Sequence, residues 1–402
     1  MFALGIERLL SDSNIKAKLH GRRVALLGHP ASVNQELEHS LDLLMREEDL
    51  KITAAFGPQH GMRGEKQDNM IESSDYHDPK YGIPVFSLYG DYRRPTPEML
   101  ESFDVILIDL QDVGCRIYTF LTTLFYVMDE CATAGKSVWV LDRPNPAGRP
   151  VEGLILKNEY QSFVGAAAVP MRHGLTLGEA AYWYKAHKKL DVDLEVVSMN
   201  DYDPKDRGGM GWVPGVLSWV NPSPNLPRLS GVQMYAGTVM IEGTTLSEGR
   251  GTTIPLELIG APDIDGEKVV EEMFRLCPDW LWACRLRPCF FEPTFQKHSH
   301  KLCSGLQIHI DQDIYEHNDF KPFRLVSLAF KSIRQIYPEY NIWRSPPYEY
   351  EKTLLPIDIL SGSDELRRWV DQEDSTMDAW EQRLSVDEAK WAEERKPHLI
   401  YG

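Results

Sequence analysis

The chain has 402 residues, of which 43% are hydrophobic and 26% charged, and its formal net charge is −17. This length favours two domains, and the composition is that of an ordinary globular protein. The negative charge argues against a nucleic-acid-binding protein, which usually carries a basic surface. The sequence also lacks a run of about 18 apolar residues that would span a bilayer. We therefore expect neither a nucleic-acid partner nor a membrane span.

The N-terminus does not have the pattern of a secretory signal peptide. Its first apolar run contains Glu7 and Arg8, and it lacks a basic start and a small-residue cleavage site. The default expectation is a cytoplasmic protein, although an exported protein whose leader had been removed would look the same. The six cysteines form no Cys-x-x-Cys pair. We expect buried thiols rather than disulfides or a zinc site.

Five short apolar runs in the first part of the chain predict strands of a parallel sheet that is covered on both faces. Helical patterns over 35–47 and 119–135 lie between them, and Gly135 is a suitable C-cap. Strands that alternate with helices predict a doubly wound, Rossmann-like α/β domain, which we assign to residues 1–230. The five runs are 23–28, 50–57, 85–90, 105–110 and 138–142.

Residues 231–402 predict a smaller α+β domain. An apolar segment covers 233–241, and the alternation over 305–310 predicts a strand. Residues 202–229 are rich in Gly, Pro and Trp, which favours an ordered connector over a flexible tether. Helices are predicted over 266–276, 322–337, 364–373 and 386–395.

The residues that follow the predicted strands are candidate ligand contacts, because ligands of such sheets bind beyond the carboxyl ends of the strands. Each segment also has an ordinary explanation: Asp109 can cap a helix, Asn145 stands among prolines in a turn, and 59–64 can be a simple connecting loop. The candidates from these segments and from a further Arg-His pair are Gln59, His60, Arg63, Asp109, Gln111, Asp112, Arg116, Asp142, Arg143, Asn145, Arg172 and His173.

The segment from Glu242 to Thr253 combines two carboxylates, one guanidinium, three glycines and five hydroxyls. Such a segment cannot be buried unless many polar groups find hydrogen bonds. We interpret it as a loop that grips a polyhydroxylated ligand, in which Arg250 clamps a carboxylate and Thr252 contacts the ligand. Glu242 and Glu248 are the leading catalytic carboxylates. The alternative is a turn network without a ligand.

Several familiar motifs are absent from the sequence. It has no phosphate-binding loop, no Gly-x-Gly-x-x-Gly after a strand and no Gly-x-Ser-x-Gly nucleophile elbow. His298 and His300 lack a further spaced ligand that would complete a metal site. We therefore expect no cofactor and no metal.

Taken together, these segments resemble exo-β-N-acetylmuramidases of the NamZ type, a family long known only as a domain of unknown function. The resemblance covers roughly residues 20 to 370. It implies a ligand cleft between a Rossmann-like domain and a smaller C-terminal domain. It also implies release of N-acetylmuramic acid from the non-reducing end of peptidoglycan fragments, with a muropeptide or amino sugar as ligand. The segments are 57–64, 82–90, 108–114, 141–146, 172–176, 242–253 and 348–351.

One departure from the family concerns catalysis. The family usually has Pro-Glu-His-Gly where this chain has Pro58-Gln-His-Gly61. That Glu is a leading catalytic candidate of the family, and Gln59 cannot donate an acidic proton, although it can hydrogen-bond a sugar. Either another carboxylate supplies the acid, or the activity is reduced, altered in specificity or lost.

Glycoside cleavage usually needs two carboxyl groups, although an N-acetyl sugar can also use its own acetamido oxygen. The best candidates are Glu242 and Glu248, followed by Asp109 and Asp112, with His60 or His173 as proton carriers. Three hypotheses stay open: a hydrolase of a terminal amino sugar, a sugar-binding relative without catalysis, and an enzyme on the same scaffold that acts on another small anion. The sequence predicts no particular oligomeric state.

Overall fold

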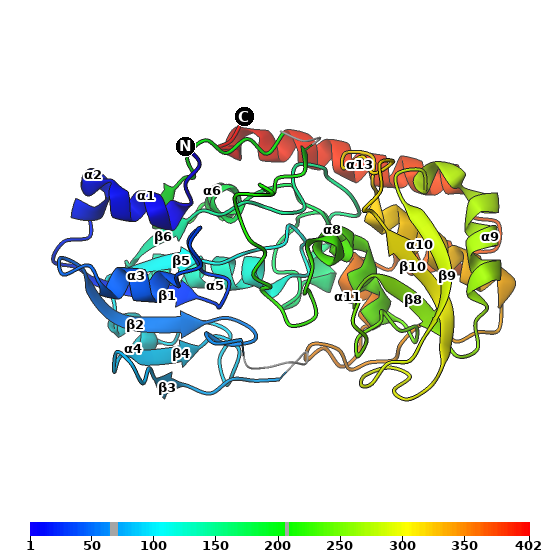
Figure 1. Ribbon diagram of the computed structural model, residues 1–402, viewed down its shortest axis with the longest axis horizontal. Helices are drawn as coiled ribbons and strands as arrows, with labels where there is room; N and C mark the ends of the chain where they lie inside the picture. Colours follow the sequence, from blue (N-terminus) through cyan, green and yellow to red (C-terminus); the bar gives the residue numbers. More distant parts are fainter. Residues whose placement is uncertain (65–70, 206–208) are drawn as a thin grey trace.

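A computed structural model describes residues 1–64, 71–205 and 209–402, which form an elongated molecule with one sheet in each half (Figure 1). The N-terminal half contains a seven-stranded sheet of order β3-β4-β2-β1-β5-β6-β7. Neighbouring strands run parallel, except that β3 is antiparallel to β4. The strands are β1 (Arg23–Gly28), β2 (Lys51–Gly57), β3 (Tyr76–His77), β4 (Pro84–Ser87), β5 (Val105–Asp109), β6 (Ser137–Leu141) and β7 (Asp193–Val197).

Helices cover both faces of this sheet. Along β1, Val24 and Leu26 join the buried cluster that contains α1 and α3, whereas Ala25 and Leu27 join the cluster of α4, α5 and α6. Alternate residues of a strand point to opposite faces, so an apolar strand buried on both sides follows directly. The predicted doubly wound α/β fold is confirmed. The helices of this half are α1 (Gly5–Ser11), α2 (Ser13–Ala17), α3 (Ser40–Met45), α4 (Pro97–Glu101), α5 (Thr119–Ala134), α6 (Leu177–Lys188) and the 3₁₀ turn η1 (Asn158–Tyr160).

The local sequence explains where three of these helices begin or end. Helix α5 ends as predicted at Gly135, which has a φ of 65° and donates its amide to Cys131 O. Helix α3 is shorter than predicted and begins after His39, whose imidazole accepts from the Leu41 amide. Helix α6 was not predicted, although Thr176 and Glu179 form a capping box at its start.

The C-terminal half has an antiparallel sheet of order β8-β10-β9, formed by β8 (Leu258–Ala261), β9 (Arg285–Phe291) and β10 (Cys303–His309). It is the smaller α+β unit expected from the sequence. The apolar segment 233–241 lies within α8 and the following 3₁₀ turn η2. The helices are α8 (Leu229–Thr238), α9 (Gly266–Leu276), α10 (Pro322–Ile336), α11 (Pro356–Ser361), α12 (Glu365–Asp371) and the 3₁₀ turns η2 (Val239–Gly243), η3 (Pro278–Trp280) and η4 (Lys396–His398).

The last long helix, α13 (Met377–Arg395), joins the two halves. Figure 1 shows it running along one edge of the molecule from the C-terminal half back to the chain's N-terminus. Arg324 on α10 forms ion pairs with Glu381 and Glu388 of α13. At the other end, the Trp391 indole donates to His173 O over 2.8 Å. The helix is longer than the predicted 386–395 because its polar first turns carry no clear apolar pattern.

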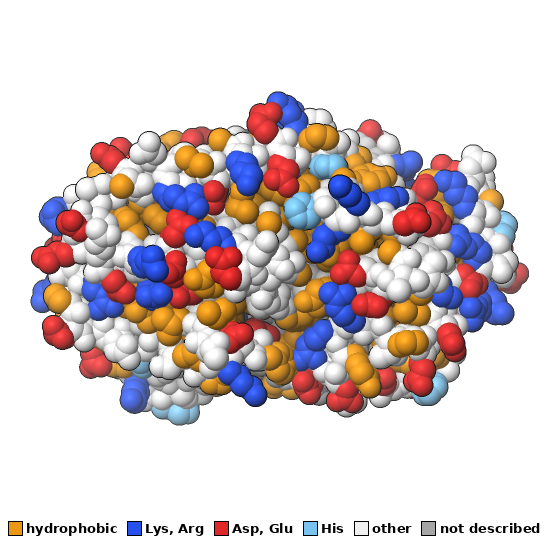
Figure 2. All heavy atoms as spheres, turned by 180° about the vertical axis from the view of Figure 1, so that it is seen from behind, with side chains coloured by type: hydrophobic (Ala, Val, Ile, Leu, Met, Phe, Trp, Pro, Cys, Tyr) orange, Lys and Arg blue, Asp and Glu red, His pale blue; other side chains and the backbone are white. Residues whose placement is uncertain are grey.

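Two general features of the chain complete this description. No helix among the described residues is long and apolar enough to cross a membrane. The six cysteines are free thiols, and all but the partly exposed Cys277 are buried. Figure 2 shows one face of the molecule, on which lysine and arginine side chains are interspersed with acidic ones over both halves.

Candidate functional site

The switch point of the sheet is filled by the protein's own side chains. Strand β1 lies between β2 and β5, so the chain leaves it in both directions and a crevice is expected at the ends of β1 and β5. There the buried Asp109 carboxylate accepts hydrogen bonds from Arg143 and from the Ser40 hydroxyl. The Ser32 hydroxyl donates to Asp109 O. The structure thus brings the predicted residues Asp109 and Arg143 together in an ion pair.

Two other predicted arginines also bind the protein itself. Arg116 is buried and donates to the backbone oxygens of Leu154, Val169 and Leu360 over 2.7–2.9 Å. Burial lowers the pKa of its guanidinium to about 10. Arg172 is equally buried and donates to Ala147 O over 2.7 Å. These guanidinium groups hold separate loops together.

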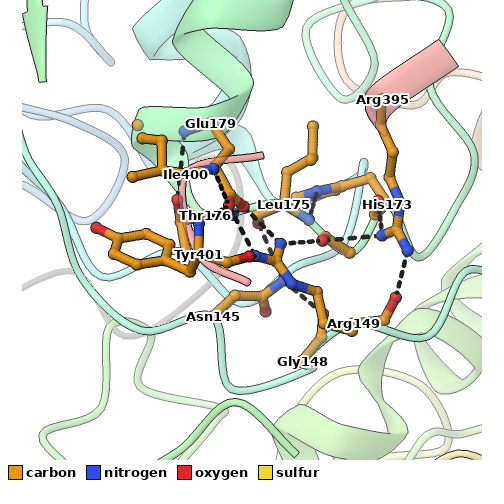
Figure 3. Close-up of polar contacts among 12 residues, drawn as sticks. Asn145, Gly148, Arg149, His173, Leu175, Thr176, Glu179, Arg395, Ile400 and Tyr401 are labelled. Carbon is orange, nitrogen blue, oxygen red and sulfur yellow. Dashed lines mark hydrogen bonds and ion pairs between the residues drawn. The ribbon is translucent and has the colours of Figure 1, made fainter. Parts of the chain in front are cut away.

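Figure 3 shows a further structural network, centred on Arg149. Its guanidinium forms two hydrogen bonds of 2.6 and 2.7 Å to Glu179, which also accepts from the amides of Ile400 and Tyr401. Arg395 donates to His173 O over 3.1 Å. The segment around the predicted residue His173 therefore anchors the C-terminal tail to the N-terminal half.

The remaining polar residues of these strand ends make similar contacts. Asn145 Nδ2 donates to Leu175 O over 3.0 Å, and Gln111 Nε2 donates to Pro144 O over 2.9 Å. Asp142 accepts from the Thr176 hydroxyl and from the Tyr401 hydroxyl, and burial raises its pKa to about 6. These contacts stabilise turns.

Asp112 and His173 face each other behind the strand ends. Asp112 Oδ2 accepts from the Gly114 amide over 2.7 Å and lies 3.6 Å from His173 Nε2. Both side chains are buried. Among the described residues, Asp112 Oδ1 and His173 Nε2 have no hydrogen-bond partner. Tyr118 lines the site described next, and burial together with the nearby charge of Asp112 raises the pKa of its hydroxyl.

An inner pocket lies between the two halves. It has a volume of about 30 Å³, which is room for water but not for a sugar ring. Gln59 Oε1 accepts from the Thr119 hydroxyl over 2.7 Å, and the φ of His60 is 71° in the turn that follows β2. The polar residues that line the pocket are Gln59, His60, Tyr118, Thr119, Ser223, Tyr235, Glu242, Arg250, Tyr348 and Glu349.

Arg250 organises the acidic side of this pocket. Its Nη2 lies 2.5 Å from Glu242 Oε1, and its Nε lies 3.0 Å from Glu248 Oε1. Burial opposes the charge of Arg250, but the two carboxylates outweigh it and raise the guanidinium pKa. Arg250 Nη1 is buried and has no partner among the residues that the structure describes. This nitrogen is therefore available to a ligand.

Glu242 and Glu248 occupy different positions around that guanidinium. The second oxygen of Glu242 accepts from the Tyr348 hydroxyl over 2.9 Å, and Glu242 lines the pocket. The second oxygen of Glu248 lies 2.7 Å from Lys297 Nζ. Burial favours the neutral form of Glu248, but Lys297 and Arg250 prevail and lower its pKa. Glu248 is thus a buried, ionised counterion behind Arg250.

The structure adds Glu349, which the sequence did not identify as a site residue. Its side chain is only 7% exposed, and the Tyr89 hydroxyl lies 3.4 Å from its Oε2. Burial, followed by the nearby charge of Glu242, raises the Glu349 pKa to about 7. A carboxyl group with this pKa holds a proton near neutral pH, as a general acid requires. The only sequence signal was its place in the segment 348–351.

Glu349 also lines a second, larger space, which we call the outer cavity. This cavity has a volume of about 760 Å³, within the usual range of ligand sites. Glu349 therefore lies at the boundary between the inner pocket and the outer cavity. The outer cavity is lined by residues of both halves: Glu72, Gly90–Arg94, Tyr126, Gln161–Phe163 and Glu349–Glu351.

Sequence profiles of a known family match almost the entire chain. The profile described as the N-terminal part of exo-β-N-acetylmuramidase NamZ matches residues 24–230, and its C-terminal counterpart matches residues 233–401. The chain belongs to this family. The peptidoglycan β-N-acetylmuramidase NamZ of Bacillus subtilis strain 168 is 39% identical over 401 residues, which are 99% of this chain and 91% of that protein.

Two crystal structures of DUF1343 family proteins from Bacteroides fragilis NCTC 9343 have the same fold as this NamZ family member. One has a TM-score of 0.87 at 29% identity, and the other has a TM-score of 0.77 at 27% identity. Each comparison covers 100% of this chain and 99% of the other. The likeness extends over both halves and hence over the cleft that contains Glu349.

The remaining predicted contacts of this NamZ family member lie outside the inner pocket. Arg63 is half-exposed, lies 3.5 Å from Asp78 and lines a separate cavity. The Thr252 hydroxyl donates to Gly249 O over 2.6 Å within a turn. Within the described ranges, no group of three or more His, Cys, Asp or Glu side chains is placed to hold a metal ion.

Proposed function

We propose that the chain is a glycoside hydrolase that removes N-acetylmuramic acid from the non-reducing end of peptidoglycan fragments. The observation that carries the proposal is the position of Glu349, a buried carboxyl group between a closed inner pocket and an open outer cavity. An exo-acting enzyme needs this arrangement, because the terminal sugar occupies a closed pocket and the rest of the glycan extends outward. Family membership and the activity of the Bacillus subtilis relative support the same reaction.

The proposal requires the inner pocket to widen when the sugar enters. Its present volume of about 30 Å³ is far below the roughly 300 Å³ at which ligand pockets begin. Tyr348 and Glu349 close it on one side, and the φ values of Glu349 and the following Tyr350 are positive, at 44° and 70°. Movement of this segment would join the inner pocket to the outer cavity.

In the proposed reaction, Glu349 donates its proton to the glycosidic oxygen as the bond from that oxygen to the sugar breaks. The sugar develops positive charge, which Glu242, held by Arg250 and Tyr348, faces across the pocket. The free Nη1 of Arg250 is a donor for the lactyl carboxylate of the sugar. Water then adds its hydroxyl group to the sugar carbon, and its remaining proton restores the acid form of Glu349.

Hydrolysis of 4-nitrophenyl N-acetyl-β-muraminide tests this function. We expect the wild-type protein to release nitrophenol. We expect Glu349→Gln to slow cleavage of a disaccharide of N-acetylmuramic acid and N-acetylglucosamine about 100-fold or more, because a leaving sugar needs the proton whereas nitrophenolate leaves without it. Exposed Glu339 allows a control with the same chemical change, and Glu339→Gln should keep the wild-type rate. A wild-type protein without turnover, or a Glu349→Gln variant as fast as the control, would contradict the proposal.

A sugar-binding relative without catalysis is a second candidate, favoured by one observation. Gln59 places an amide at the inner pocket, where the family usually has a carboxyl group. Calorimetry with muropeptides separates the two candidates, because binding without turnover supports the second and turnover excludes it. Gln59→Glu is the companion variant, and a gain in hydrolysis would place position 59 next to the reacting bond.

A further inference from the structure

The outer cavity has a charge pattern that the proposed cleavage reaction does not require. Three carboxylates, Glu72, Asp91 and Glu351, line it together with the guanidinium groups of Arg93 and Arg94. A ligand in this cavity experiences the charge that is left after the protein's own ion pairs have formed. The partners of the two arginines therefore decide the sign of that charge.

Both arginines already have acidic partners. Arg94 Nη1 lies 3.1 Å from Asp129 Oδ2 and 3.1 Å from Glu130 Oε1, so two carboxylates share one guanidinium. Arg93 Nη2 lies 3.3 Å from Glu72 Oε1. Neither arginine is thus a free cation for an anionic ligand.

The flat faces of the two guanidinium groups are covered by aromatic rings. Arg94 stacks on Tyr126, with 3.7 Å between the guanidinium carbon and the ring centre. Arg93 lies 4.4 Å from the ring centre of Tyr89 and 4.7 Å from that of Tyr350. This stacking holds the groups in place and forms a platform of π-systems beside Glu349.

The carboxylates, by contrast, keep their charge. Glu351 accepts hydrogen bonds of 2.6 Å from both the amide and the hydroxyl of Thr353, which lower its pKa to about 2. The Tyr350 hydroxyl, with Arg93, lowers the pKa of Glu72. Asp91 is exposed at the rim. The outer cavity is therefore negative at neutral pH.

A second feature identifies this cavity as a ligand site. The Glu349 side chain is 7% exposed and lines the cavity, and its Oε1 has no hydrogen-bond partner among the described residues. The inner pocket lies on the other side of the same carboxyl group. A molecule in the outer cavity is consequently on the leaving side of the bond that Glu349 would protonate.

We infer that the outer cavity binds the leaving sugar of the glycan and selects it by charge, accepting a neutral or cationic amino sugar and excluding an anionic one. This inference rests on the proposed function. An N-acetylated sugar is neutral, and its free-amine counterpart is cationic at neutral pH. The carboxylates of Asp91 and Glu351 attract the amine and repel an acidic substituent.

Three matched disaccharides with terminal N-acetylmuramic acid test the inference: their leaving sugars are N-acetylglucosamine, glucosamine and glucuronic acid. We expect kcat/KM for the glucosamine compound to equal or exceed that for the N-acetylglucosamine compound. For the glucuronic acid compound we expect a kcat/KM at least fivefold lower than that for the N-acetylglucosamine compound. Salt screens exposed charges, and at 0.5 M the screening length is only about 4–5 Å. This salt concentration should therefore reduce the differences in kcat/KM among the three compounds.

The double variant Asp91→Asn, Glu351→Gln removes two of the charges while it keeps the shape of the cavity. In this variant, the kcat/KM values of the glucosamine and glucuronic acid compounds should differ by less than twofold. Asp311 and Glu339 are exposed in the C-terminal half, and the matched control Asp311→Asn, Glu339→Gln should keep the wild-type spread. Equal kcat/KM values for all three compounds, or the same spread in both double variants, would overturn the inference.

Failure of the proposed function gives a different result, namely no turnover of any compound. In that case, calorimetry with free glucosamine and glucuronic acid tests the cavity itself. Tighter binding of glucosamine that is lost in Asp91→Asn, Glu351→Gln supports the inference. Equal binding of both sugars, or no binding of either, contradicts it.

Discussion

The polar side chains at the switch point of the sheet and those around the inner pocket differ in how fully the protein satisfies them. At the switch point, Asp109 and Arg143 bind each other, and both terminal nitrogens of Arg116 donate to backbone oxygens, whereas its buried Nε has no partner among the described residues. At the inner pocket, Arg250 keeps one guanidinium nitrogen without a partner among the described residues, and Glu349 keeps one oxygen. Unused hydrogen-bonding capacity therefore indicates a site where the group also lines a pocket, as Arg250 and Glu349 do.

The largest effect on stability should follow from breaking the switch-point pair. Asp109→Ala leaves the buried Arg143 without its carboxylate, so the free energy of unfolding should fall by about 3–5 kcal/mol. Urea denaturation measures the change, with exposed Asp311→Ala as the control. If Asp109→Ala kept its stability but lost activity 100-fold, Asp109 would belong to the ligand site and the comparison would fail.

Glu242→Gln should produce the opposite pattern. The amide oxygen still accepts from Arg250, and the amide NH2 can donate to the Tyr348 hydroxyl oxygen, so the stability should change by less than about 2 kcal/mol. The loss of charge opposite the developing cation should lower kcat about 100-fold. Hydrolysis kinetics and urea denaturation on one preparation check both parts. Wild-type kcat in Glu242→Gln would remove this residue from the proposed chemistry.

The pKa of Glu349, about 7, predicts the pH dependence. Above pH 7 the general acid loses its proton, and kcat/KM should fall about tenfold per pH unit.

The free energy of unfolding should also depend on pH. Between pH 4.5, which is the ordinary pKa of this group, and pH 7, the folded protein holds the Glu349 proton while the unfolded chain does not. The stabilisation is therefore full below pH 4.5 and is lost as the pH rises through 7. Thermal unfolding of wild type and Glu349→Gln from pH 4 to 8 measures it, and parallel curves would contradict the assignment.

Arg63→Ala should have the smallest effect. The side chain is half-exposed and lines a cavity separate from the inner pocket. Removing a partly solvated charge there should change KM and kcat less than about twofold. Steady-state kinetics with a peptidoglycan disaccharide provides the measurement, and an increase of tenfold in KM would extend the binding site to that cavity.

Much of the N-terminal sheet could be predicted from the sequence, because strands buried on both faces leave continuous apolar runs. The run 23–28 matches β1, and 105–110 contains β5. Helix α6 was missed because its buried residues are flanked by lysines and a histidine, although its capping box was visible as Thr176 and Glu179.

The candidate site was only partly predictable. Gln59, His60, Glu242 and Arg250 were all singled out, and the structure brings them to one pocket. Glu349 was not, because its raised pKa arises from burial between two halves of the chain and from Glu242, which lies far away in the sequence. Local sequence carries no trace of such an environment.

Other residues were predicted to contact a ligand although their hydrogen-bond partners lie within the protein, far away in the sequence. Arg116 seemed available to a ligand, yet it donates to Leu154 O and Leu360 O, which lie 38 and 244 residues away in the sequence. A charged residue in a Gly-rich turn gives no indication of such partners. Only the tertiary structure shows that its two terminal nitrogens already have partners.

The anchored tail of Figure 3 has a consequence for biosynthesis. Glu179 binds the amide of Tyr401, which the ribosome adds 222 residues later. A nascent chain that has completed its large sheet still lacks the residues that cover the Arg149–Glu179 pair. Contacts between such distant residues form slowly. The N-terminal half therefore emerges with an unfilled groove, and its assembly is finished only after the C-terminal half has been translated.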